Sequence, residues 1–235
     1  MLTPVGSVTA TPFPIIPEGR IQIFRLGEMS LVTSPIQVTA RLLSQVGKVV
    51  RVELFGEDGR LITRQVKVFY DIPWQVGSIN MELDFEISGA AEVGRLVISV
   101  EDSYGRLIDI NSVNLVLLST GVTELNPATA VWQTILIQEP VAKALIIGGT
   151  AYIAGLARPN SAGPLRIELI TQDKLVIGHR LAGVSIPVPG GYGIFAAEVP
   201  YFVSDIIPAL LVVYEEGEPV SDISHLASVD VLLSP

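Results

Sequence analysis

The sequence predicts an all-β protein built from two tandem antiparallel β-sandwiches. Short runs of alternating apolar and polar residues recur along the chain, and Gly, Pro, Asp or Asn separates them. An internal repeat divides the chain into two similar halves. No segment shows the apolar stripe and end caps that indicate a helix. Many short strands separated by turns are typical of a sandwich.

The strands are expected in order along the first half. The clearest alternation covers residues 79–87, where five apolar positions face one side and four polar positions face the other, as in a half-buried antiparallel strand. Residues 50–54 alternate in the same way, and residues 56–59 then supply turn chemistry. Further strands are expected near 21–24, 36–43, 60–68, 94–101 and 112–118.

Three blocks of the first half recur in the second half in the same order. The first pair is separated by 115 positions, the second by 114, and the third pair matches with one residue deleted. Chance matches between apolar strands are common, but three ordered blocks at nearly one spacing indicate a repeat. The matching blocks are 51–58 with 166–173, 96–101 with 210–215, and 112–119 with 228–234.

This repeat predicts how the chain is divided. The expected parts are a Thr/Pro-rich spacer at 1–19, a first sandwich at 20–119, a linker at 120–133 and a second sandwich at 134–235. The linker contains Leu125 and Trp132. Because a fully exposed Trp is unusual, we expect these two side chains to pack between the sandwiches.

Composition excludes several classes of function. The formal net charge of −9 and the pI of about 4.7 argue against nucleic-acid binding and against adhesion to anionic membranes. No apolar run is long enough for a membrane-spanning helix. The chain has no cysteine, which excludes disulfides, a thiol nucleophile and Cys-ligated zinc.

One family shares the order of these features. The segments that match it in order are 34–40, 50–54, Pro73-Trp74 and 94–100, with Asp109 before the last strand. They resemble the immunoglobulin-like domain of bacterial spore-germination and other envelope lipoproteins. The second copy is similar but looser, with Glu139-Pro140 for the Ser-Pro and Tyr192-Gly193-Ile194-Phe195 in place of the Trp74 segment.

The resemblance implies two tandem immunoglobulin-like antiparallel β-sandwiches with an accessory or binding role and no catalytic residues. It also implies an extracytoplasmic protein, in the cell envelope or secreted. Residues 1–19 lack the basic start and apolar stretch of a signal peptide. We therefore expect that an export signal or lipid anchor is absent from this chain, and that the spacer acts as a tether.

Catalytic chemistry has little basis in the residues. The two histidines are His179 and His225. Asp222, Ser224 and His225 are the residue types of a hydrolase triad, but neighbours in one short run do not converge on one substrate, and no Gly-x-Ser-x-Gly elbow accompanies them. The sequence therefore predicts a protein that is not an enzyme.

Acidic residues cluster at strand ends, and oxygen ligands gathered there would suit Ca²⁺. The candidate ligands are Glu101, Asp102, Asp109, Glu215, Glu216 and Asp222. None has the Asp-x-Asp-x-Asp-Gly spacing of a dedicated calcium loop. Solvated turn residues are the preferred interpretation, and Ca²⁺ is the alternative.

Two kinds of partner are compatible with the sequence. Some apolar residues fall on faces where polar residues would be expected, and such faces mark contacts with other sheets or other chains; they are Val49, Phe55, Val97, Ile170, Leu211 and Val213. A binding or scaffolding module that contacts a protein partner, or a second copy of itself, is the first hypothesis. A carbohydrate-binding module is the alternative, with Trp74 and Tyr192 as the aromatic candidates.

Overall fold

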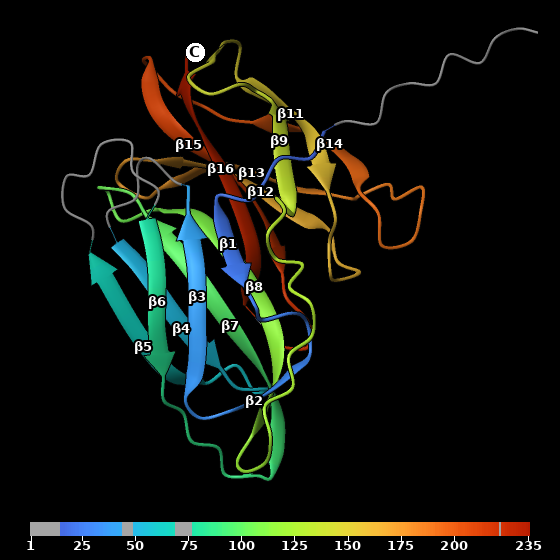
Figure 1. The fold of residues 1–235 in the computed structure, drawn as a ribbon. Helices are drawn as coiled ribbons and strands as arrows, with labels where there is room; N and C mark the ends of the chain where they lie inside the picture. Colours follow the sequence, from blue (N-terminus) through green and yellow to red (C-terminus); the bar gives the residue numbers. More distant parts are fainter. Residues whose placement is uncertain (1–14, 44–48, 69–76, 221) are drawn as a thin grey trace, which may run out of the picture.

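The computed structural model describes residues 15–43, 49–68, 77–220 and 222–235. These residues form sixteen β-strands and no helix, so none of them forms a helix that could cross a membrane. The all-β fold class is therefore confirmed. Figure 1 shows the strands stacked in layers, with the early strands below and the late strands above.

The first half is a two-layered sandwich. Its strands are β1 (Ile21–Phe24), β2 (Ser30–Thr33), β3 (Ile36–Leu42), β4 (Val49–Phe55), β5 (Leu61–Val68), β6 (Gly77–Leu83), β7 (Ala91–Glu101) and β8 (Leu107–Leu118). One layer has the order β1-β3-β6, and the other has the order β8-β7-β4-β5. The short strand β2 pairs in parallel with β8.

The second half repeats this arrangement strand by strand. Its strands are β9 (Ile135–Glu139), β10 (Leu145–Ile146), β11 (Thr150–Ala157), β12 (Leu165–Thr171), β13 (Val176–Ala182), β14 (Gly193–Pro200), β15 (Ile207–Glu216) and β16 (Ile223–Leu233). The layers are β9-β11-β14 and β16-β15-β12-β13, and β10 pairs in parallel with β16. Each half thus has the strand order of an immunoglobulin-like sandwich.

Alternation along the strands builds each core. In β3, Ile36, Val38 and Ala40 are buried while Gln37 and Arg41 are exposed, because successive side chains of a strand point to opposite faces. The buried side chains pack against those of the facing layer. Full burial of one such aliphatic side chain contributes about 1.5–3 kcal/mol.

The two halves meet where β8 lies beside β16. Leu226 pairs with Ile110 and joins the two larger layers into one continuous sheet. Leu210, Val212 and Leu226 belong to the hydrophobic core of the first half although they lie in the second. We call this contact the seam. The division of the chain into separate domains at 20–119 and 134–235 stays a prediction.

The seam explains part of the apolar outward faces that the sequence shows. Val97 is buried in the shared cluster, and Phe55 and Ile170 pack against it. Leu211 and Val213, however, were expected on an outward face, and this expectation is wrong because both lie in the core of the second half.

The reason is a difference of one residue in the repeat. Val52 pairs with Ile98 in the first half, and the equivalent Ile167 pairs with Val213 in the second. The spacing is therefore 115 through β15 as well as β12, and the match at 114 is wrong. A shift of one residue moves every side chain of a strand to the opposite face.

The linker lies along the first half as an additional extended segment. Glu124 pairs with Leu31, and Trp132 pairs with Glu18. The carbonyl of Ala130 accepts hydrogen bonds from the Ile23 amide and from the Asn111 side chain. The linker is therefore held mainly by its backbone.

Leu125 and Trp132 are not enclosed between the halves, although Trp132 borders a small void at the seam. Their exposed fractions are 45% and 46%, so the prediction that they pack between the sandwiches is wrong. The seam between β8 and β16 supplies the contact between the halves that the sequence assigned to Leu125 and Trp132. Its apolar side chains come from central strands and bury more area than these two linker side chains.

Gly155 offers a test of how tightly β9 and β11 pack. A Cβ atom there would overlap the carbonyl oxygen of Leu136 and lie 2.8 Å from the ring of Phe195. We expect Gly155→Ala to lower the free energy of unfolding by about 1–3 kcal/mol, measured by denaturant titration. Gly183→Ala is the matched control, since nothing lies within 4 Å of its Cβ position, and it should change stability by less than about 0.5 kcal/mol. Equal effects of the two substitutions would contradict the packing argument.

Candidate functional site

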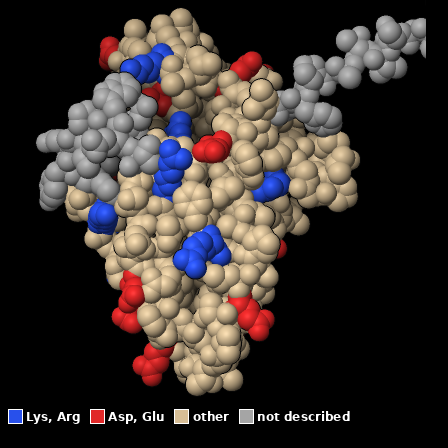
Figure 2. Space-filling model, in the orientation of Figure 1, with Lys and Arg blue, Asp and Glu red and all other residues tan. Residues whose placement is uncertain are grey.

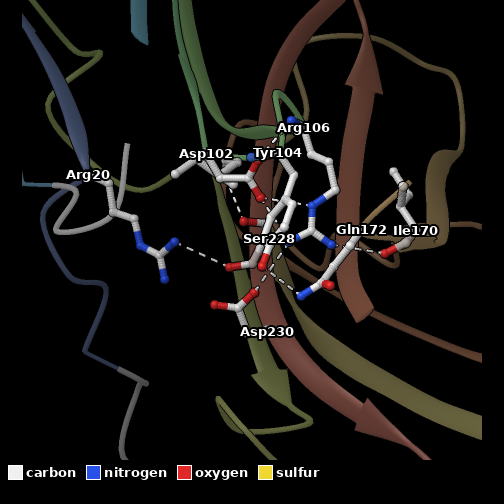
Figure 3. A network of polar contacts seen from close by, with 9 residues as sticks. Arg20, Asp102, Tyr104, Arg106, Ile170, Gln172, Ser228 and Asp230 are labelled. Carbon is white, nitrogen blue, oxygen red and sulfur yellow. Dashed lines mark hydrogen bonds and ion pairs between the residues drawn. The ribbon is translucent and has the colours of Figure 1, made fainter. Parts of the chain in front are cut away.

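A groove of about 570 Å³ lies at the seam and is lined from both halves. Its charged lining residues are Arg20, Asp102, Arg106, Lys143 and Asp230. Figure 3 shows Arg20 from the segment before β1, Asp102 and Arg106 from the turn between β7 and β8, and Asp230 from β16 lying close to one another. The volume lies within the range of small-molecule sites. Most of the polar groups that line it, however, are already hydrogen-bonded or ion-paired within the chain.

The turn between β7 and β8 is fastened to the second half. Asp102 accepts hydrogen bonds from the amides of Tyr104 and Arg106 at 2.9 Å and from Arg106 Nε at 2.8 Å. Arg106 Nη1 also donates to the carbonyl of Ile170 at 3.2 Å, and Gln172 donates to the Tyr104 hydroxyl at 2.9 Å (Figure 3). Arg106 therefore neutralises a buried carboxylate and links the halves at the same time.

Arg20 makes a second connection across the seam. Its Nη1 donates to the carbonyl of Ser228 at 3.2 Å and lies 3.5 Å from Asp109 Oδ2. The Ser228 hydroxyl donates to the Ile108 carbonyl at 2.7 Å. Asp109 is 2% exposed, and burial raises its pKa to about 7 although Arg20 acts in the opposite direction.

Arg95 fastens the opposite end of the seam. Its Nε donates to Asn114 Oδ1 at 3.0 Å, and its Nη2 donates to the Glu218 carbonyl at 3.1 Å. Burial lowers the pKa of this guanidinium, while Glu28 and Glu215 raise it. A Cβ atom on Gly217 would overlap the guanidinium, so any larger residue in the β15–β16 turn would displace Arg95 from this position.

Glu215, His225 and Ser224 lie together, but they do not form a catalytic triad. Glu215 Oε2 lies 3.3 Å and Ser224 Oγ 3.2 Å from the same ring nitrogen, Nδ1 of His225. A triad needs the hydroxyl and the carboxylate on opposite ring nitrogens. Burial raises the pKa of Glu215, but hydrogen bonds from His225 and Ser161 outweigh it and lower the pKa overall. The group is a structural polar contact between β15 and β16.

The six carboxylates considered as calcium ligands are not brought together. In the described part of the chain, no three acidic or histidine side chains surround a point that could hold a metal ion. Glu215 contacts His225, as described above, and Asp222 accepts a hydrogen bond from the Ile223 amide. The other four are paired with arginines, namely Glu101 with Arg51, Asp102 with Arg106, Asp109 with Arg20 and Glu216 with Arg166.

The aromatic candidates do not form a sugar platform among the described residues. The Tyr192 hydroxyl donates to the Gln133 carbonyl at 2.8 Å, and the guanidinium of Arg158 lies 5.5 Å from the ring centre. One face of Tyr192 is therefore covered. Trp74 lies outside the residues that the structure describes.

An apolar surface that the sequence analysis missed covers the outer face of β11 and β14. Matching registers make this face comparable with that of β3 and β6. Cross-strand pairs of the first half are Gln37 with Glu82, Thr39 with Asn80 and Arg41 with Ser78. The equivalent pairs of the second half are Tyr152 with Glu198, Ala154 with Ala196 and Leu156 with Ile194. The outer face of β3 and β6 is therefore polar, whereas the equivalent face of β11 and β14 is almost uncharged.

Much of this surface is exposed and available for contact, although Leu156 at one end of it is buried. Tyr152 is 52% and Ile194 is 64% exposed, and Ala196 is exposed between them. Figure 2 shows that on one side of the molecule the charged side chains are scattered singly over an otherwise uncharged surface. The signal in the sequence is the missing polar alternation in 150–157 and 193–200, where Glu198 is the one charged residue.

No protein-family model and no curated protein matches this chain. Among solved structures, it is similar to a red sea bream transglutaminase at 11% identity with a TM-score of 0.31, covering 92% of this chain and 31% of that one. A chimeric titin Z1Z2-Z1Z2 tandem is 14% identical with a TM-score of 0.25, covering 93% and 98%. An ICAM-5 D1-D4 ectodomain fragment is 10% identical with a TM-score of 0.28, covering 91% and 54%. The fold assignment rests on strand order and register alone.

Arg106 tests the seam network. Arg106→Ala leaves Asp102 buried without its counter-charge, and we expect the free energy of unfolding to fall by about 3–5 kcal/mol. Arg166→Ala breaks a solvent-exposed ion pair with Glu216 and should cost less than about 1 kcal/mol. Denaturant titration of both variants checks this. If replacing Asp102 together with Arg106 does not restore part of the lost stability, then lost packing, and not the unpaired charge of Asp102, explains the effect of Arg106→Ala.

Proposed function

We propose that this chain is a non-enzymatic binding or scaffolding module of the cell envelope that acts through protein–protein contacts. The observation that carries the proposal is the apolar outer face of β11 and β14. The same face of the first half carries Gln37, Arg41 and Glu82 at equivalent positions. Since exposed apolar patches on folded proteins mark interaction surfaces, the second half is the contact-making half.

The partner that this face fits is a second copy of the chain. Small side chains at its centre, Ala154 and Ala196, leave it flat, as a sheet requires to pack on another sheet. A two-fold axis along the strands between β11 and β14 places Tyr152 of each copy opposite Glu198 of the other. The hydroxyl can then donate to the one carboxylate of the face, and Ala154 lies opposite Ala196. The face is its own complement, as a two-fold contact demands.

The size of the face predicts a weak contact. Eight residues of strand are about 26 Å long, and three strands are about 14 Å wide. That area is well below the roughly 800 Å² per partner of a stable complex. Weak contacts of this kind gain strength when many copies are tethered to one surface, which suits a scaffold in the envelope. The resemblance to envelope lipoproteins supports this location.

Sedimentation velocity over a wide range of concentration tests the proposal. We expect the protein to associate reversibly at high concentration, and Ala196→Arg to abolish association by placing a charge at the centre of the face. Asn80→Arg, at the equivalent position of the first half, is the matched control and should associate like the unmodified protein.

A protein that stays monomeric at every concentration would overturn the proposed partner, as would equal effects of the two substitutions. Binding of the monomer to a glycan array would instead favour the carbohydrate-binding alternative, in which Tyr192 is the described aromatic candidate. Both outcomes are distinguishable because the glycan assay does not depend on self-association.

A further inference from the structure

Asp109 occupies a special position at the seam. It precedes Ile110, the residue of β8 that pairs with Leu226 of the second half. Its side chain is 3% exposed and borders a void of about 10 Å³, close to the space of one water molecule. The void is lined from the segment before β1, from the linker, and from β8, β9 and β16. Any separation of the halves would expose this carboxyl group.

Few charges face Asp109. Among the residues lining the void, the other charged or titratable side chains are Arg20 and His225. Arg20 is about half exposed, lies 3.5 Å from the carboxylate and is shared with the Ser228 carbonyl. His225 is directed to Glu215 through Nδ1. In the described chain, the carboxylate of Asp109 therefore has one long ion pair to offset its burial.

Burial of an ionised carboxylate with so little compensation is costly. The protonated form avoids this cost, and accordingly the pKa of Asp109 is raised to about 7 in the closed seam. In an opened seam, water would return the pKa to about 3.9. Between these two values the closed form binds a proton that the open form does not, so a rise in pH favours opening. Above about pH 7 both forms are ionised and the balance no longer changes.

We propose that Asp109 is a proton-controlled latch between the two halves. Protonated Asp109 keeps the seam closed and the halves rigid with respect to each other. Ionised Asp109 favours a state in which β8 and β16 separate and the carboxylate is hydrated. The contacts of Arg106 and Arg95 with the second half hold the seam closed at its two ends. Ionisation of Asp109 therefore changes how often the seam opens, and these two contacts close it again.

Distance measurements between the halves test the latch. The chain has no cysteine, so Glu86→Cys and Ser204→Cys, both exposed, place one spin label in each half. We expect double electron–electron resonance on dilute protein to give a narrow distance distribution at about pH 5 and a broader one at about pH 8. Asp109→Asn in the labelled chain should give the narrow distribution at both pH values, because the amide cannot ionise.

Two controls separate Asp109 from its neighbours. His225→Gln should keep the difference between the two pH values; if it removes the difference while Asp109→Asn keeps it, the latch is assigned to the wrong residue. Carbon-13 NMR of the Asp carboxyl groups in the unmodified protein gives a second reading that needs no folded variant. A titration midpoint near 7 supports the proposal, and a midpoint below about 5 overturns it. Identical distributions at both pH values in the unmodified background would also overturn it.

Discussion

The pairing of Leu226 with Ile110 is the constraint on which the arrangement of the molecule depends. It turns two separate four-stranded layers into one sheet and brings Leu210 and Val212 into the core of the other half. The hydrophobic effect supplies the driving force for this contact. Polar groups then fix its register, since Arg106 and Arg95 each bond to backbone carbonyls across the seam.

Strand alternation was sufficient to predict the fold class, and the repeat was sufficient to predict two similar halves. Residues 79–87 and 50–54 fall in or beside β6 and β4 because burial of one face imposes period two on the sequence. The short strands β2 and β10 were not predicted, because β10 has two residues and the sequence of β2, Ser-Leu-Val-Thr, does not alternate between apolar and polar residues. Their pairing with β8 and β16 comes from tertiary contacts alone.

The candidate site was harder to predict, and the misses have a common cause. Charged and aromatic residues drew attention to Glu101, Asp222 and Tyr192, but each is engaged within the chain. The apolar face of β11 and β14 lies where polar residues are missing, and a missing residue is noticed only when an equivalent position is available for comparison. The registers of β3 with β6 and of β11 with β14 supplied that comparison, because they place Asn80 and Ala196 at equivalent positions. The one-residue error in matching β7 with β15 shows that sequence similarity alone does not supply it.

The parallel pairing of β10 with β16 also determines how the molecule responds to mechanical load. Once the preceding strand β9 has been detached, a pull along the chain would act on the start of β10 and on the end of β16, in opposite directions along two strands that run the same way. The same holds for β2 and β8 in the first half. In this geometry all the backbone hydrogen bonds of a pair are sheared together and are not opened one after another. Each half is therefore arranged to resist extension, with a rupture rate set by the barrier to unfolding.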